Sequence, residues 1–197
     1  MNNELILNLH RIGAVKFGAF KLKSGMVSPI YLDLRILISH PPILRAAAQA
    51  LAPVLGALRF DRIAAIPYAA LPIGTAVALE MNRPLIYPRR EKKEYGTGRA
   101  IEGEFRAGET AVVIDDVITT GASKIEAIEP LVAAGLVVRD IVVLIDREQR
   151  GAAELAERGY TVHAVLKLRQ IVQVLKDAAM VSSDEYDAVY AFLGGAR

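Results

Sequence analysis

Residues 110–123 place an apolar, β-branched run before two acids, a Thr-Thr-Gly turn and several small residues. The run at 110–114 is typical of a central strand in a parallel sheet, and a helical pattern begins at residue 122. A strand, a short loop and a helix in this order predict one unit of an α/β fold. In such folds, ligands bind beyond the carboxyl ends of the strands. The segment therefore predicts both a fold class and the edge of the sheet that carries a site.

The rest of the chain alternates in the same way. Apolar runs predict strands at 62–66, 84–87, 137–145 and 160–166. Amphipathic or Ala/Leu-rich patterns predict helices at 2–14, 41–58, 71–81, 122–134, 152–157, 168–177 and 183–193. Short extended segments are expected at 16–34, whereas 89–106 is charged and Gly-rich. At 197 residues this indicates one α/β domain, with a mainly parallel central sheet flanked by helices.

Composition excludes several classes of function. The chain has no cysteine, which excludes a thiolate nucleophile, a disulfide framework and a thiolate metal site. Lys plus Arg is 24 and Asp plus Glu is 22, and this near balance argues against a surface that binds polyanions throughout. The absence of cysteine fits a reducing compartment, so we expect a cytoplasmic protein.

Neither a targeting signal nor a membrane anchor is expected. The first four residues lack the basic start and apolar stretch of a signal peptide. The longest uncharged run, at 63–79, is interrupted by Pro67, Pro72 and Gly74, so it is interpreted as strand, turn and helix.

The segment after the 110–114 strand has the chemistry to hold a phosphorylated sugar. Asp115 and Asp116, the acid pair, suit sugar hydroxyls or a magnesium shell reached through water. The residues that follow, the glycine loop (residues 118–123), offer free N–H groups at a helix N-terminus, which suit a phosphate. The donors of this loop come from Thr119, Thr120, Gly121, Ala122 and Ser123. An ordinary strand-ending turn and helix cap would explain part of the pattern, but the complete pattern is more specific.

The glycine loop lacks the Gly-Lys-Ser/Thr of a nucleotide P-loop and the Gly-x-Gly-x-x-Gly of a dinucleotide fold. Residues 112–123 instead resemble the phosphoribosyl diphosphate (PRPP) signature of type I phosphoribosyltransferases. Three further segments, 16–35, 89–99 and 144–151, resemble the N-terminal segment, mobile catalytic loop and base-contacting segment of orotate phosphoribosyltransferases. The resemblance covers about residues 10–175 and is nearest to the orotate domain of uridine monophosphate synthases, partly through residues 67–72.

The resemblance implies a fold, a reaction and partners. The fold would be the type I phosphoribosyltransferase fold, with a small hood from about 16–35 plus part of the C-terminal region, and a mobile loop at 89–103. The reaction would convert orotate and PRPP to orotidine 5′-monophosphate and diphosphate, in pyrimidine biosynthesis. Mg²⁺ would be held mainly by PRPP and water near the acid pair. Family members are homodimers whose loop reaches the neighbouring site, and we expect no nucleic acid or membrane partner.

The resemblance also assigns residues to PRPP. Residues 89–99 hold five basic and two acidic residues, so they can form a cationic lid over diphosphate. The lid lysine that supports diphosphate departure would be Lys93. The acid pair, Asp115 and Asp116, would also be catalytic. Further PRPP contacts would come from Tyr68, Arg89, Arg90, Tyr95 and the glycine-loop residues. By itself, such a charged run is usually a solvated loop.

The orotate contacts would come from Lys23, Tyr31, Leu32, Thr119 and Arg147. Arg147 would bind the orotate carboxylate, because a guanidinium fork matches a planar carboxylate. Simpler readings remain: an ion pair with Asp146 or Glu148 for Arg147, an exposed lysine for Lys23, and core packing for Tyr31.

Ala69 departs from the pattern of many bacterial members, which carry a lysine there that contacts diphosphate. Either the lid cations compensate for this lysine or the affinity for PRPP is lower. His10, His40 and His163 match no catalytic position. Two alternatives stay open: transfer to a purine or uracil, and a PRPP-sensing regulator that binds nucleic acid without catalysis, which would need a second basic face.

Overall fold

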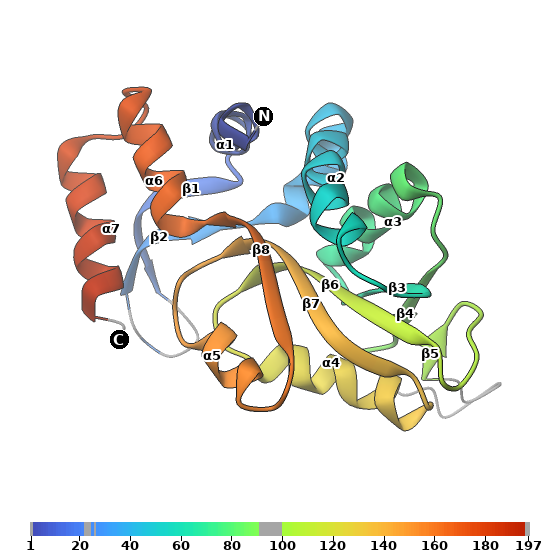
Figure 1. Ribbon diagram of the computed structural model, residues 1–197. Helices are drawn as coiled ribbons and strands as arrows, with labels where there is room; N and C mark the ends of the chain where they lie inside the picture. The colour runs from blue at the N-terminus through green and yellow to red at the C-terminus, as the bar shows by residue number, and fades with distance from the viewer. Residues whose placement is uncertain (1, 22–24, 26, 91–99, 196–197) are drawn as a thin grey trace.

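A six-stranded sheet in the order β5-β4-β3-β6-β7-β8 forms the centre of the molecule (Figure 1). The computed structural model describes residues 2–21, 25, 27–90 and 100–195. The strands are β3 (Arg62–Ala65), β4 (Leu85–Pro88), β5 (Ile101–Glu102), β6 (Thr110–Ile118), β7 (Val137–Asp146) and β8 (Thr161–Lys167). All neighbouring pairs are parallel except β4 and β5. The predicted mainly parallel sheet is therefore confirmed.

Helices cover both faces of this sheet. One face carries α2 (Pro41–Gly56) and α3 (Ala70–Met81), and the other carries α4 (Ala122–Ala133) and α5 (Gly151–Ala156) (Figure 1). Alternate residues of β6 serve the two cores: Val112 and Ile114 join the cluster under α2 and α3, whereas Ala111 and Val113 join the cluster under α4. This alternation directs Asp115, the next residue on the second face, toward α4.

The two ends of the chain build a second layer beside the sheet. An antiparallel pair, β1 (Val15–Lys21) and β2 (Val27–Leu32), is followed by a 3₁₀ helix, η1 (Leu34–Ser39). The remaining helices are α1 (Asn2–Arg11), α6 (Leu168–Asp177) and α7 (Ser183–Gly195). Helix α1 packs on α6 and α2, and α7 packs on β2. The start and the end of the chain therefore meet on the same side of the molecule.

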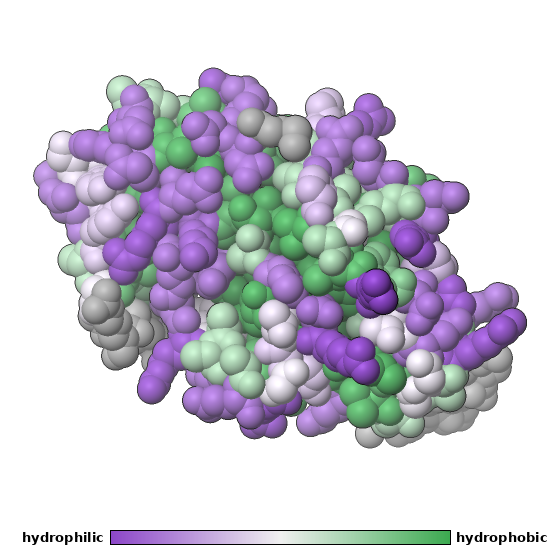
Figure 2. All heavy atoms as spheres, in the orientation of Figure 1, coloured by the Kyte–Doolittle hydropathy of each residue, from purple (hydrophilic) through white to green (hydrophobic). Residues whose placement is uncertain are grey.

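Hydrophilic residues cover much of the rim of the face seen in Figure 2, and hydrophobic residues show near its centre, where β7 and β8 pass in Figure 1. Within the described part of the chain, no helix combines the length and apolar character that crossing a bilayer requires.

The structure differs from the predicted elements at four places. The first helix ends at Arg11 rather than residue 14, because Gly13 adopts a left-handed φ of 74° and β1 begins at Val15. Neither η1 nor β5 was expected, since both lie in segments without clear periodicity. The strand predicted to end before the acid pair continues to Ile118, where it still pairs with β7.

Candidate active site

The acid pair lies within β6, near the carboxyl end of the sheet. Asp115 and Ile118 both remain in the ladder with β7, so strand pairing fixes the backbone of the pair. Asp115 is buried and Asp116 is half-buried. The Asp116 N–H donates to Asp115 Oδ1 at 2.9 Å, and the Val117 N–H donates to Asp116 Oδ1 at 2.8 Å. Local bonds therefore orient both carboxylates before any ligand binds.

Lys124 is a functional candidate that sequence reasoning missed. Its ammonium lies 2.7 Å from Asp115 Oδ2 and donates to the Val117 carbonyl at 2.6 Å, and the residue is only 4% exposed. A signal was present, because Lys124, Ile128 and Leu131 share one face of a helix at i, i+4 and i+7. A lysine on an otherwise buried apolar face requires an acidic partner.

Burial and a neighbouring charge act together on the pKa of Asp116. Burial, and then the neighbouring negative charge of Asp115, raise the pKa of Asp116 to about 7, while Lys124 opposes this shift. The ammonium is paired directly with Asp115, not with Asp116. Asp116 can therefore take up a proton near neutral pH.

The glycine loop is held from the side of α5. The Gly121 N–H donates to Glu154 Oε2 at 2.9 Å, and the Gly151 N–H donates to the Thr119 carbonyl at 3.2 Å. A Cβ on Gly151 would lie 2.9 Å from the Thr119 carbonyl oxygen, so only glycine permits this close approach. Glu154 and Gly151 were not among the predicted site residues.

A cavity of about 340 Å³ opens beside the acid pair. It collects side chains from the turn after β3, the end of β4, the acid pair and the first turns of α4. Predicted site residues among its lining are Tyr68, Arg89, Arg90, Asp115, Asp116 and Ser123, and Ala69 and Lys124 join them. The Arg90 guanidinium lies over the Tyr68 ring at 5.8 Å, and Arg89 pairs with Glu102. Six of the predicted PRPP residues therefore line one cavity, whereas Thr119, Thr120, Gly121 and Ala122 are not among its lining.

Arg147 follows β7 and is buried. Its Nη2 donates to Ser28 Oγ at 3.2 Å, whereas Nε has no hydrogen-bond partner in the part of the chain that the structure describes. Within the described residues, no carboxylate forms an ion pair with it: Asp146 accepts from the Glu148 N–H, and Glu148 lies 3.8 Å from Arg169. Burial lowers the pKa of Arg147. The simple reading of Arg147 as half of an ion pair is therefore wrong.

The backbone N–H of Arg147 donates to the Ile118 carbonyl at 3.1 Å, which seats this residue beside the glycine loop. Tyr31 stacks on Phe20 at 5.3 Å and accepts from Arg35 Nη2 at 3.2 Å, and Leu32 is half-buried. Three predicted site residues, Lys23, Lys93 and Tyr95, lie outside the described residues.

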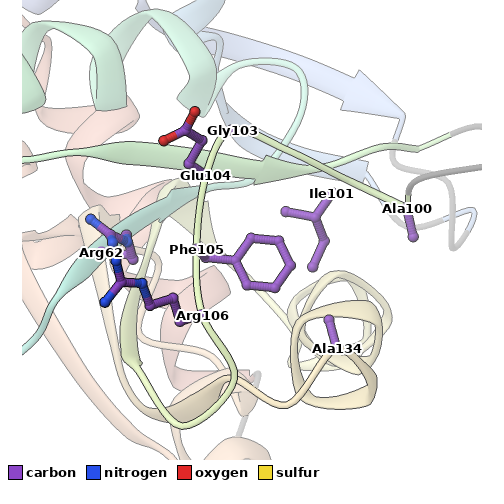
Figure 3. A pocket seen from close by; sticks show the side chains of 8 residues that line it. All are labelled: Arg62, Ala100, Ile101, Gly103, Glu104, Phe105, Arg106 and Ala134. Carbon is purple, nitrogen blue, oxygen red and sulfur yellow. The ribbon is translucent and has the colours of Figure 1, made fainter. Parts of the chain in front are cut away.

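A larger hollow of about 560 Å³ lies elsewhere, beneath residues 100–106 (Figure 3). Ile101, Phe105 and Ala134 form its apolar wall, and Arg62 stands at its other side. Both oxygens of Glu109 already accept from Arg62, at 2.7 and 2.8 Å. Because Arg62 begins β3, this hollow reaches the amino end of the strands, opposite to the edge where such sheets bind ligands.

The donor set near the acid pair fits a metal that arrives with its substrate. Within the described residues, no three His, Cys, Asp or Glu side chains cluster closely enough to hold a cation by themselves. Mg²⁺ is usually bound through one or two carboxylates plus substrate phosphates and water. The two carboxylates beside the glycine loop could supply the protein's share of such a site. The phosphates of the ligand would have to supply the remaining charged ligands.

Comparison with known proteins places this geometry in a class. No family model matches the chain. The UMP synthase structure from Leishmania donovani superposes with a TM-score of 0.92 at 47% identity, over 98% of this chain and 42% of that one. Orotate phosphoribosyltransferase from Aeropyrum pernix gives 0.78 at 33% identity, over 90% and 99%. The fold is that of the type I phosphoribosyltransferases.

Sequence relatives narrow the class. Orotate phosphoribosyltransferase from Pyrobaculum aerophilum is 40% identical over 96% of this chain and 97% of its own length. The chain belongs to the orotate phosphoribosyltransferase family. The bifunctional enzyme PyrF/PyrE from Nostoc is 43% identical over 96% of this chain, which spans only 40% of that protein.

Proposed function

We propose that the protein transfers the 5-phosphoribosyl group from PRPP to orotate, giving orotidine 5′-monophosphate and diphosphate in pyrimidine biosynthesis. The observation that carries the choice of base is the buried Arg147 guanidinium, which has a free Nε and no acidic partner in the described chain. An isolated buried charge is costly, so a site that keeps one is suited to an anionic ligand. Orotate carries a carboxylate, whereas uracil and the purine bases do not.

In this proposal, different groups of residues bind different parts of the two substrates. The glycine loop binds the 5-phosphate through its remaining N–H groups, since the Gly121 N–H already donates to Glu154. The acid pair accepts the ribose hydroxyls. Arg147 binds the orotate carboxylate beside the loop, with Lys23, Tyr31, Leu32 and Thr119 around the base. Arg89 and Arg90 meet the diphosphate, together with Lys93 and Tyr95 of the lid. Mg²⁺, when bound with PRPP, would neutralise charge on the diphosphate.

The chemistry then requires positioning more than it requires a reactive side chain. Diphosphate leaves the anomeric carbon through an oxocarbenium-like state, while negative charge grows on the leaving oxygens. Fixed cations around those oxygens lower the barrier most when water is excluded. A lid formed by residues 89–103 supplies both the cations and the exclusion of water. We further propose a cytoplasmic homodimer in which this lid serves the neighbouring site.

The test is the loss of orotate absorbance when PRPP is added to the protein with Mg²⁺, with a chelator as the control. Orotate should be consumed with equimolar release of diphosphate, and chelation should stop the reaction. Uracil, hypoxanthine and adenine are offered in parallel. Turnover of one of these bases and none of orotate would contradict the assignment of the base while leaving PRPP as the donor.

A further inference from the structure

Lys124 has no ammonium donor left for a ligand. Its three N–H groups meet three acceptors: Asp115 Oδ2 at 2.7 Å, the Val117 carbonyl at 2.6 Å and Ser123 Oγ at 3.4 Å. The residue borders the cavity, yet it is only 4% exposed. Direct contact with a phosphate would require it to release one of these acceptors. We therefore look for the role of Lys124 in the protein groups that it binds.

Lys124 binds the acid pair through Asp115. Asp115 accepts from Lys124 on Oδ2 and from the Asp116 N–H on Oδ1, so both of its oxygens are oriented. Asp116 has one oriented oxygen, Oδ1, which accepts from Val117. Two adjacent carboxylates also repel each other, and the buried ammonium beside Asp115 offsets part of this repulsion. Lys124 therefore acts on both the geometry and the charge of the pair.

Apart from the 3.4 Å contact between Lys124 and Ser123 Oγ, the glycine loop is held by a different set of bonds. The Gly121 N–H donates to Glu154, the Thr119 carbonyl accepts from Gly151, and the Ile118 carbonyl accepts from the Arg147 N–H. All three partners come from the segment between β7 and the end of α5. The acid pair and the glycine loop are thus supported from different directions, although they are neighbours in the sequence.

We propose that Lys124 is a positioning residue for the sugar half of the site. It holds Asp115 in the orientation in which the acid pair accepts the ribose hydroxyls, and it contributes nothing to binding of the 5-phosphate. Glu154 has the complementary role, because it holds the amide of Gly121 in the phosphate half. This inference rests on the proposed function, since it takes a phosphorylated ribose as the ligand.

Two simple ligands separate the halves by calorimetry without turnover or metal. Inorganic phosphate probes the glycine loop alone, and ribose 5-phosphate probes the loop and the acid pair together. Lys124→Met should weaken ribose 5-phosphate about 10- to 100-fold, as loss of an outer-shell partner does at metal sites, and leave phosphate affinity unchanged. Glu154→Ala should weaken both ligands by the same factor. Lys16→Met, on exposed β1, is the matched lysine control and should change neither.

Each other outcome has a definite meaning. Unchanged ribose 5-phosphate affinity in Lys124→Met, or an equal loss of both ligands, overturns the proposal for Lys124. If the wild-type protein binds neither ligand, the proposed function fails instead. Because Lys124→Met leaves a buried carboxylate unpaired, it can fail to fold. Lys124→Gln keeps a donor for the Val117 carbonyl without the charge, and it should show the same selective loss.

Discussion

At the scale of single residues, two buried charges define the chemistry of the site. Asp115 has its cation within the protein, since Lys124 pairs with it at 2.7 Å. Arg147 has no carboxylate partner in the described residues, and its Nε is unsatisfied. A buried charge without a partner lowers stability, and it is retained where a ligand supplies the partner. The two residues therefore show which half of the proposed site is complete without substrate and which half is not.

Replacement of Arg147 by Met should separate binding from stability. We expect the KM for orotate to rise by about 30-fold or more, because truncating one partner of a buried charge pair costs about 2–5 kcal/mol. The KM for PRPP should change little. The ligand-free variant should melt higher than the wild type, because an uncompensated buried charge is gone. Steady-state kinetics and a thermal melt check both, and a lower Tm with unchanged KM would contradict the assignment.

Asp116 predicts a pH effect on the ligand-free protein. A carboxyl whose pKa rises on folding binds more protons folded than unfolded between its ordinary pKa and about 7. Its contribution to the free energy of unfolding therefore falls as pH rises through that window, and it is constant above it. Asp116→Asn cannot titrate, so this pH-dependent decrease in the free energy of unfolding should disappear. The variant keeps an acceptor for the Val117 N–H.

The Tm of Asp116→Asn relative to wild type should therefore be greater at pH 8 than at pH 5. A difference of a few degrees is expected, since about 1 kcal/mol shifts the Tm of such a domain by roughly 2–4 °C. Melts of both proteins in chelator, from pH 5 to 8.5, give the comparison. Parallel curves across that range would show that Asp116 does not titrate there.

At the scale of elements, a glycine allows helix α3 to pack closely on the sheet beside the cavity. Gly74, in α3, faces β3: a Cβ at this position would lie 2.6 Å from Ala65 Cβ. Real Cβ atoms do not approach so closely, so a larger residue must push α3 away from the sheet. The turn after β3, with Tyr68 and Ala69, leads directly into this helix.

Gly74→Ala should lower the free energy of unfolding by about 1–3 kcal/mol, the usual cost of overpacking a core. Gly56→Ala is the matched control, because it ends α2 and a Cβ there meets no atom within 4 Å. That control should be neutral or slightly stabilising, since alanine favours helix more than glycine does. Denaturant unfolding of the two variants measures the difference, and equal stabilities would contradict the packing argument.

At the scale of the whole molecule, a buried hydrogen bond joins the second layer to the site. Ser28 of β2 accepts from Arg147 Nη2 and donates to the Ile30 carbonyl at 2.7 Å, joining the β1–β2 layer to the end of β7. Helix α7, from the end of the chain, packs on β2. Both ends of the chain thus support the proposed base site.

The proposed sharing of the lid predicts complementation between inactive variants. Lys93→Ala should remove the lid cation, and Asp116→Asn should remove a sugar contact, so each homodimer should turn over slowly. Mixed after unfolding and refolding together, they should regain about a quarter of wild-type activity, because half of the dimers are mixed and each has one intact site. Activity that stays at the level of the parents would contradict a lid that acts in trans.

Local patterns in the sequence were enough for the sheet, most helices and the neighbourhood of the acid pair and the glycine loop. Strand and helix periodicities are local, and the carboxyl ends of parallel strands always share one edge. The pattern failed where pairing partners decide the structure: β6 continues through the acid pair because β7 lies beside it, and β5 forms only against β4.

The sequence by itself determined the fold class, the edge of the sheet with the proposed site and most of the residues gathered there. Only the tertiary structure decided how the charges are shared. It placed Lys124 beside Asp115, Glu154 against Gly121, and Arg147 beside Ser28, with no described acid as its partner. These contacts join residues from separate elements across the core. Their energies depend on burial and distance, which no local pattern in a sequence contains.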